Sequence, residues 1–329
     1  MAHNSLRFGI TLAACIFLVG AADSNGATRY AGDFLMLGAG ARALGMGSAF
    51  SATSDGAVSA YYNPAGLMGL KSREIDIMHS EQFGGLENYN TFAIASPVSP
   101  VETVGIALVH LGVGDIPVTR LWDPSRALGD SNRVEVAYRT DAADYALLLA
   151  GAKRINEAFA VGATVKLIRR SLGKDTAFGY GIDLGATYRM TSALTLAGVF
   201  RDVTGTTVAW DVKSSAENHT TKDRIDPTLD VGASYSAPLP WFGGVCTVAA
   251  SMLFLGDSYS EKGIDTMNLG AEYRFRDLVV FRGGSSAGHG SFGLGLTRLP
   301  LIASSSLDYA FLSHSDLDST HRVSMTIRY

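Results

Sequence analysis

A serine-containing stretch near residue 285 has the residue types of a hydrolase nucleophile. Gly284-Ser285-Ser286-Ala287-Gly288 fits the Gly-x-Ser-x-Gly pattern, and His289 follows directly. Such a serine attacks esters because a turn between a strand and a helix exposes its hydroxyl beside backbone N–H groups. The flanking sequence alternates like β-strands on both sides, which favours a hairpin turn, where Gly and Ser are common. A barrel lipid hydrolase using Ser285 or Ser286 is kept as an alternative.

A glycine-rich motif at residues 38–43 fits a dinucleotide-binding fingerprint. Gly38-Ala39-Gly40-Ala41-Arg42-Ala43 matches the looser Gly-x-Gly-x-x-Ala pattern and follows a strand-like stretch, Phe34 to Leu37. The fingerprint binds a pyrophosphate only within a strand–helix–strand unit that supplies an acidic residue about 20 positions later. The sequence that follows is a compact small-residue segment and then a series of antiparallel strand patterns. We therefore predict no dinucleotide site here.

The remaining metal-ligating residue types form no site pattern. The seven histidines are dispersed, and the two cysteines, Cys15 and Cys246, lie far apart. This spacing excludes a disulfide framework and a Cys-x-x-Cys zinc or redox site. We expect no metal and no cofactor.

Charged residues on the polar faces of the expected strands give the one site hypothesis. Arg42 precedes these strands, and its guanidinium can bind a carboxylate through charge-assisted hydrogen bonds. Its acidic partner is predicted among residues such as Asp183, Asp230 and Glu272, and the pair would hold the N-terminal segment against the strands. The alternative is that these charges are only hydrated. The charges assigned to the polar face are Asp183, Arg189, Asp230, Glu272 and Arg274.

The elements that must position these residues are long strands with a period of two. From about residue 74 onward, large apolar side chains occupy every second position in runs of roughly ten residues, with small or polar side chains between them. Each such strand has one apolar face and one polar or glycine-lined face. The clearest run places Ile182, Leu184, Ala186, Tyr188 and Met190 against Asp183, Gly185, Thr187 and Arg189.

Strand length separates the two architectures that such strands can build. A soluble sandwich uses strands of about five or six residues, whereas a membrane barrel turns its apolar face to lipid and needs about 9 to 11. The longer runs here predict an all-β transmembrane antiparallel β-barrel of about 14 strands, an even number as in bacterial barrels. The expected strands span residues 74–83, 88–97, 101–112, 143–153, 159–171, 179–189, 194–204, 228–237, 244–255, 266–275, 278–285, 290–298, 302–312 and 320–329.

The connections between these strands alternate in length. With the first strand starting in the periplasm, the expected periplasmic connections are short, and the outer ones include the two longest, residues 113–142 and 205–227. Transmembrane barrels have short periplasmic turns and longer outer loops, so the alternation supports the prediction. In the first long loop, Ile116, Val118, Leu121 and Trp122 could form an apolar collecting surface or pack on one another.

Composition and charge limit the possible partners. The 329 residues are 47% hydrophobic and 18% charged, with a formal net charge of −4. These values exclude an intrinsically disordered chain, and the scatter of Lys and Arg gives no basic stripe for nucleic acid. The 37 glycines exceed the usual share of about 7% and suit strands that surround a crowded lumen.

Residues 1–27 have the pattern of a secretory signal peptide. Arg7 precedes an apolar stretch from Phe8 to Ala22, and Gly20 and Ala22 fit the small residues of a cleavage site. The stretch is shorter than the roughly 20 apolar residues of a membrane helix. Lipidation of Cys15 is the less favoured alternative.

Residues 28–72 are predicted to form an N-terminal plug in the lumen, and residues 73–329 the barrel. The segment is dense in Ala and Gly, so it is compact enough to fit inside a barrel. Ser54 or Asp55 is expected to cap a short helix, which ends at Asn63 because the residue before a proline disfavours helix.

The N-terminal segment resembles the signature of the PorV/PorQ family of outer-membrane proteins. The resemblance lies in the run from Leu37 to Phe50, in Asp55, and in Tyr61-Tyr62-Asn63-Pro64-Ala65-Gly66-Leu67. More distantly the chain is similar to FadL-type fatty-acid transporters, which carry an Asn-Pro-Ala element in a plug. The resemblance implies a 14-stranded outer-membrane barrel with a lumenal plug, and Tyr329 matches the terminal aromatic that the barrel insertion machinery reads. The residues implied for the plug motif are Arg42, Gly45, Met46, Gly47, Asp55, Asn63, Pro64, Ala65 and Gly66.

The resemblance implies two different functions. FadL-type members pass hydrophobic or amphipathic molecules through a plugged barrel, and we expect this function in the outer membrane, among outer-membrane lipid. PorV-type members are accessory barrels of the type IX secretion system, which partner a translocon and carry cargo proteins. The partner is accordingly either a hydrophobic small molecule or a set of secretion-system proteins.

Overall fold

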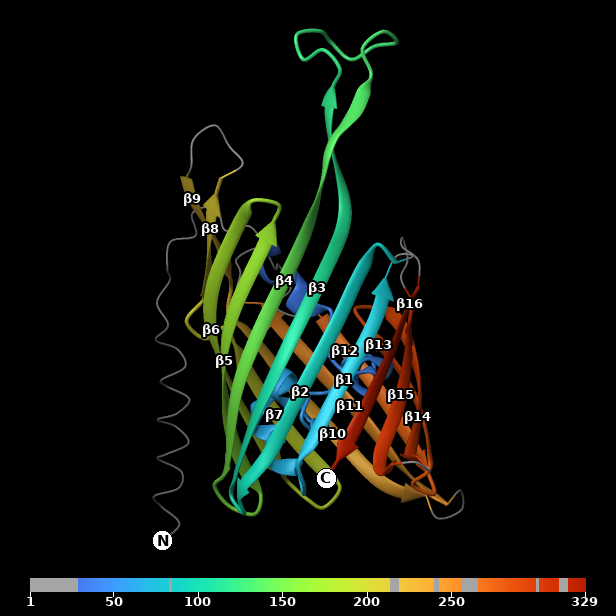
Figure 1. The fold of residues 1–329 in the computed structure, drawn as a ribbon. Helices are drawn as coiled ribbons and strands as arrows, with labels where there is room; N and C mark the ends of the chain where they lie inside the picture. The colour runs from blue at the N-terminus through green and yellow to red at the C-terminus, as the bar shows by residue number, and fades with distance from the viewer. Residues whose placement is uncertain are drawn as a thin grey trace.

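Fourteen antiparallel strands close into a barrel in the computed structural model (Figure 1). The structure describes residues 29–82, 85–213, 219–239, 243–255, 266–299, 302–313 and 319–329, so the predicted signal peptide lies outside the described residues. One sheet contains all 16 strands, and pairing of β5 with β6 closes it, with β8 and β9 outside the ring. The predicted all-β barrel is thus confirmed. The barrel strands are β1 (Glu74–Gln82), β2 (Glu87–Ser99), β3 (Glu102–Leu121), β4 (Val134–Arg154), β5 (Phe159–Leu172), β6 (Asp175–Arg189), β7 (Leu194–Arg201), β10 (Thr228–Leu239), β11 (Gly244–Leu255), β12 (Thr266–Phe275), β13 (Val279–Ser286), β14 (His289–Leu299), β15 (Ile302–Leu312) and β16 (Thr320–Arg328).

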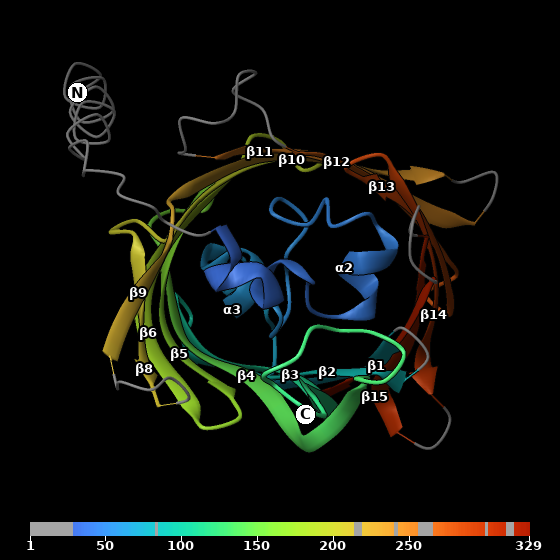
Figure 2. The ribbon, with the colours of Figure 1, turned by 90° about the horizontal axis from the view of Figure 1, so that it is seen from above.

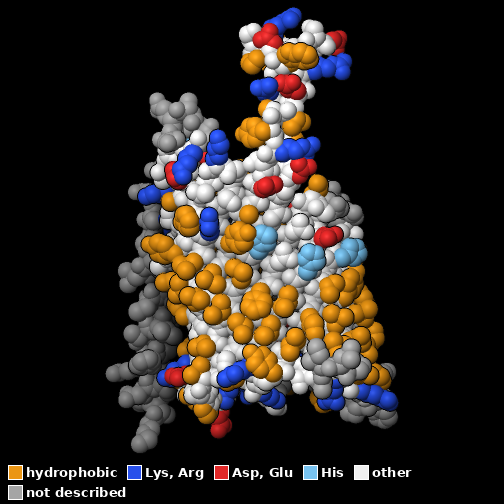
Figure 3. Space-filling model, viewed as in Figure 1, with side chains coloured by type: hydrophobic (Ala, Val, Ile, Leu, Met, Phe, Trp, Pro, Cys, Tyr) orange, Lys and Arg blue, Asp and Glu red, His pale blue; other side chains and the backbone are white. Residues whose placement is uncertain are grey.

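The strands direct apolar side chains outward and polar side chains into the barrel. On β1, Glu74, Asp76 and Ser80 are buried, whereas Ile77 between them is exposed on the outer wall. Figure 3 shows the resulting apolar band around the middle of the visible face. Such an outer surface needs lipid, and closed β-barrels of this kind lie in bacterial outer membranes, so this chain is an outer-membrane protein. Among the described residues, no helix has the length and apolar character needed to span a membrane.

Both long outer connections contain strands that the sequence pattern does not predict. β3 and β4 continue past the barrel as one long hairpin, and β8 (Thr206–Val212) and β9 (His219–Ile225) form a second hairpin that pairs with β6 (Figure 1). Because these parts lie beyond the membrane, no lipid-facing alternation marks them. On the first hairpin, Ile116, Val118 and Leu121 are half-buried and Trp122 is exposed.

Residues 29–72, here called the lumenal segment, lie inside the barrel (Figure 2). The strand-like stretch Phe34 to Leu37 forms no strand, because Phe34 lies in the 3-10 helix at residues 29–36 and packs into the apolar core. The prediction of a Ser54 or Asp55 cap is also wrong, because the helix starts at Ser59 after Val58, and Asp55 binds Arg42 instead. The segment contains η2 (Arg29–Met36), α2 (Ala41–Gly45), α3 (Ser59–Tyr62) and η3 (Pro64–Gly69).

The two enzyme-like motifs adopt other structures. Ala287 and Gly288 have φ values of 50° and 86° between β13 and β14, as in a tight two-residue hairpin turn. Ser285 lies on the outward face of β13, and the Ser286 hydroxyl donates to Asn268 Oδ1 at 2.7 Å. The motif therefore forms no strand-to-helix elbow. The glycine motif at residues 38–43 likewise leads into the five-residue helix α2 and not into a strand–helix–strand unit.

Candidate functional site

The lumenal segment meets the barrel wall at glycines, which let the two backbones touch. The backbone of Met46 and Gly47 lies against Gly270 on β12 and Gly284 on β13. A Cβ at Gly284 would overlap the backbone of both segment residues, and a Cβ at Gly270 would overlap the Met46 carbonyl. Gly47 has a φ of 60° and would itself overlap the β13 backbone if it carried a Cβ. In the same way, a Cβ at Gly45 would lie 3.0 Å from the Cα of Gly293.

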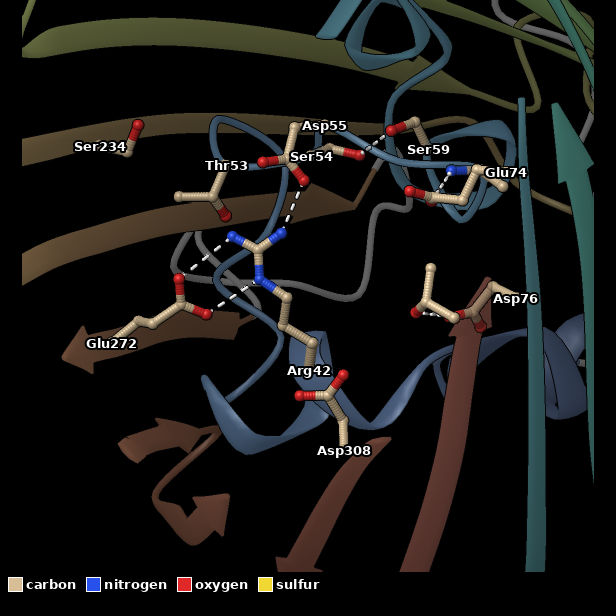
Figure 4. A network of polar contacts seen from close by, with 12 residues as sticks. Arg42, Thr53, Ser54, Asp55, Ser59, Glu74, Asp76, Ser234, Glu272 and Asp308 are labelled. Carbon is tan, nitrogen blue, oxygen red and sulfur yellow. Dashed lines mark hydrogen bonds and ion pairs between the residues drawn. The ribbon is translucent and has the colours of Figure 1, made fainter. Parts of the chain in front are cut away.

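Arg42 binds one carboxylate of the wall and one of its own segment (Figure 4). Its Nε donates to Glu272 Oε2 at 2.9 Å and its Nη2 to Glu272 Oε1 at 3.2 Å, a bidentate pair. Its Nη1 donates to Asp55 Oδ1 at 2.6 Å. The Glu272 side chain is only 3% exposed, so this pair is shielded from water and stronger than a surface pair.

Glu272 is the centre of a larger charge cluster. Arg282 Nε donates to Glu272 Oε2 at 2.8 Å, and Arg274 Nη2 donates to Oε1 at 3.2 Å. Arg282 also pairs with Asp308 at 2.6 Å. One carboxylate thus faces three guanidinium groups, so removal of Arg42 alone leaves Glu272 with two partners.

The other acidic residues that the sequence offered to Arg42 have different partners. Asp183 binds Lys166 at 2.8 Å, and the same ammonium binds Asp202 at 2.6 Å. Asp230 pairs with Arg201 at 3.5 Å. Pairing of Arg42 with Asp183 or Asp230 is therefore excluded. Lys166 and Arg201 were not singled out by the sequence, because nothing in their local pattern marks a partner on another strand.

The Asn63-Pro64-Ala65 element fits against glycines of β5 and β6. Asn63 Nδ2 donates to the carbonyl of Ser51 at 2.9 Å, and its Oδ1 accepts the N–H of Ala65 at 3.1 Å. A Cβ at Gly185 would overlap the Asn63 side chain, and Gly162 faces the backbone of Pro64. The element therefore turns the chain within the lumen and also contacts the barrel wall. Gly66 packs on the backbone of Ser54.

Two tyrosines hold the start of the lumenal segment. The Tyr61 hydroxyl donates to the carbonyl of Leu35 and accepts the N–H of Gly38 at 3.1 Å. The Tyr62 hydroxyl accepts the N–H of Ala39 at 3.0 Å. Burial raises the pKa of both phenols, so both stay neutral. These bonds hold the end of η2 and the residues that follow it against α3.

A polar cavity of about 370 Å³ lies at the end of the lumen that carries the short turns. Arg189, at the end of β6, is exposed and lines this cavity, and Arg154 beside it donates to the carbonyl of Met68 at 3.1 Å. Seven of the fifteen residues that the sequence singled out line this cavity, although they come from distant parts of the chain. They are Arg42, Asp55, Ala65, Gly66, Arg189, Glu272 and Arg274. Tyr329 lies elsewhere, exposed at the end of β16.

The opposite half of the lumen has an apolar inner wall that the sequence analysis missed. Phe34 of η2 packs in one cluster with wall residues that face inward and are almost fully buried. A sequence signal exists for several of them, because they break the alternation by standing beside an outward apolar residue, as in Ile77-Met78 and Leu167-Ile168. The residues are Met78, Tyr89, Val109, Leu148, Ile168 and Ala177 of the barrel wall and Val208 of β8, here called the lumenal apolar patch.

An arginine and two aromatic rings lie beside this patch. The Arg170 guanidinium lies over the Phe34 ring at 5.8 Å and over the Trp210 ring at 5.6 Å. Two hydrogen bonds of 2.9 Å to Asp144 fix its orientation. The Trp210 indole donates to Asp223 at 2.9 Å. The hairpin of β8 and β9 therefore contributes directly to this aromatic cluster.

Comparison with known proteins relates the fold to solved barrels. No protein-family model and no curated protein matches the chain. The toluene transporter TbuX of Ralstonia pickettii matches with a TM-score of 0.59 and 14% identity, over 89% of this chain and 98% of that chain. The toluene transporter TodX of Pseudomonas putida has a TM-score of 0.57 and 12% identity, over 88% and 96%. A Pseudomonas aeruginosa FadL homologue has a TM-score of 0.56 and 12% identity, over 88% and 98%. The chain therefore has a FadL-like barrel fold.

Proposed function

We propose that this chain passes small hydrophobic molecules across the outer membrane through its lumen. The observation that carries the proposal is the lumenal apolar patch, because a water-filled pore has no use for large apolar side chains on its inner wall. The fold supports it, since two solved barrels of the same fold are named as toluene transporters. PorV/PorQ membership rests on the sequence resemblance alone.

The arrangement along the lumen supports a route with one covered binding site. Phe34, Leu44 and Leu67 of the lumenal segment lie in one buried cluster with the patch, so a permeant would take the position of such side chains, with Phe34 the largest of these three. The polar cavity beside Arg42 lies at the other end of the lumen, between the lumenal segment and the short turns. Passage therefore requires the lumenal segment to shift, with Arg42 and Glu272 as the contact that resists the shift.

Binding of a hydrophobic fluorescent dye to the purified barrel tests the patch. Ile168→Asn puts an amide into the patch, and we expect it to weaken dye binding about tenfold, as burial of a polar group without a partner costs about 1–3 kcal/mol. Phe34→Ala removes the competing ring and should strengthen binding. The matched control is Thr91→Ser, a polar inward position opposite Val109. Equal binding by all four proteins would exclude the patch as the site.

We further propose that Arg42 acts as a latch between the lumenal segment and the wall. Arg42→Ala should loosen the segment and raise the ion conductance of the barrel in a planar bilayer. We expect a loss of about 1–3 kcal/mol in the free energy of unfolding, since charge-assisted hydrogen bonds are lost but Glu272 keeps two partners. The control is Arg120→Ala, which breaks an exposed pair with Glu135. Unchanged conductance and unchanged protection of the segment from protease in Arg42→Ala would exclude the latch.

A second candidate function, that of a secretion accessory of PorV type, is supported by the long hairpin of β3 and β4. Its exposed apolar side chains Trp122, Val136 and Tyr138 stand above the barrel, where they could contact another protein. Purification from native membranes separates the two functions. A stoichiometric large translocon partner would exclude an independent transporter, whereas an isolated barrel with a lipid-like ligand would support one.

A further inference from the structure

We propose that the outer wall binds the headgroup of a phosphate-bearing lipid at a row of polar side chains on β1 to β5. This site is separate from the passage proposed above. The row runs across neighbouring strands on the outward face, and His321 on β16 lies beside it. Figure 3 shows histidines gathered along the upper edge of the apolar band. The residues of this histidine row are His79, Asn90, His110, Tyr145 and Arg169.

Strand register aligns these residues, although they are far apart in the sequence. Asn90 pairs directly with His79 on one side and with His110 on the other. His110 pairs with Tyr145, which pairs with Arg169. Directly opposed residues have Cβ atoms about 4.5–5.5 Å apart, so the side chains form one line along the wall.

The hydrogen bonds of the row leave one imidazole nitrogen of each histidine for a ligand. His79 Nδ1 lies 2.7 Å from Asn90 Oδ1, and Asn90 Nδ2 donates to His110 Nδ1 over 3.4 Å. His321 Nδ1 bonds the Tyr309 hydroxyl at 2.7 Å. His110 accepts at Nδ1, so in its neutral form its proton is on Nε2, whereas neutral His79 donates from Nδ1 to the Asn90 oxygen and has an acceptor at Nε2. His110 and Arg169 therefore supply the outer N–H donors of the row.

Two of these rings are held in place before any ligand binds. The His110 ring lies on the Tyr145 ring with centroids 4.6 Å apart, and its Nε2 is 3.3 Å from where a Cβ would stand on Gly112. The His321 ring contacts Phe311 edge-on at 5.6 Å. Fixed donors lose little entropy on binding, which favours a specific site over loose contact.

The position of the row matches a lipid and not a soluble anion. Two residues below it on the outward face lie Ile77, Phe92 and Leu108, all more than a third exposed. Acyl chains pack on such side chains, so the donors face the height of the headgroup, where a phosphate accepts hydrogen bonds. Among the described residues, no group of His, Cys, Asp or Glu side chains could hold a metal ion.

Arg169 gives the row a positive charge. Arg169 stacks on Phe178 at 5.7 Å, and among the described residues it makes no ion pair. On β1, the Glu81 carboxylate lies 3.9 Å from His79 Nε2 and repels an anion at that end of the row. The anion is therefore expected between His110 and Arg169.

Native mass spectrometry of the detergent-purified barrel tests the site with a diphosphorylated glycolipid as probe. We expect retention by the unmodified chain. The double variant His110→Phe/His321→Phe should retain at least tenfold less. His289→Phe, a change in the hairpin turn between β13 and β14, is the matched control, and migration on unheated gels checks that each variant is folded.

Three results would overturn the proposal. The first is equal retention by the double variant and the unmodified chain. The second is equal retention of a diacylglycerol with the same acyl chains, which would mean apolar contact only. The third is displacement of the glycolipid by millimolar inorganic phosphate, which would mean a site for a free anion.

Discussion

Gly284→Val is expected to push the lumenal segment off the barrel wall and open the lumen to ions. The added side chain would overlap the backbone of Met46 and Gly47, which has no flexible end that could move aside. We expect a several-fold rise in conductance in planar bilayers. The free energy of unfolding should fall by about 1–3 kcal/mol, as in overpacked cores. Gly284→Ala should have the same effect to a lesser degree.

The neighbouring residue provides the control for this prediction. Gly283 faces lipid on the same strand, and a Cβ there would meet nothing within 4 Å. Gly283→Val should therefore leave conductance unchanged. If Gly284→Val conducts like Gly283→Val although both are folded, close contact with β13 does not keep the lumen shut.

Lys166→Met is expected to give the largest loss of stability in the barrel. Its ammonium lies between Asp183 and Asp202, and all three side chains are at most 8% exposed. Removal leaves two buried carboxylates without the cation that pairs with both of them, which costs about 3–5 kcal/mol. Urea unfolding of the folded barrel in lipid measures the difference.

Lys153→Met is the matched control, because Lys153 pairs with Glu102 in an exposed position at 3.1 Å. Exposed pairs contribute about 0–1 kcal/mol, so this variant should unfold almost like the unmodified chain. Adding Asp183→Asn and Asp202→Asn to Lys166→Met should recover part of the loss. Equal stability of Lys166→Met and Lys153→Met would mean that water reaches the buried cluster.

The barrel strands were predictable from sequence because lipid and lumen impose opposite requirements on alternate residues. Ile182, Leu184 and Tyr188 face lipid as the period of two requires, with Asp183 and Gly185 inside. Outside the membrane this constraint ends, so β8 and β9 and the ends of β3 and β4 went unpredicted. Their strands pair in water, where neither face must be apolar.

The candidate site was only partly predictable, because register and not sequence spacing decides which side chains meet. The sequence identified Arg42 and Glu272, but it could not choose among three acidic partners that lie on different strands. The stretch that begins at Phe34 looked strand-like, since a short apolar run does not distinguish a strand from a helix that packs on a wall. Ile168 was overlooked because its neighbour Leu167 satisfied the alternation.

Uptake of radiolabelled toluene by intact cells tests the central claim most directly. The host should lack hydrophobic transporters of its own and express either the unmodified chain or the double variant Leu148→Asn/Ile168→Asn at equal surface levels. We expect the unmodified chain to raise the uptake rate well above that of empty cells and the variant to match empty cells. Equal uptake by cells with either protein, or no increase with the unmodified chain, would contradict passage of hydrophobic molecules along the lumenal apolar patch.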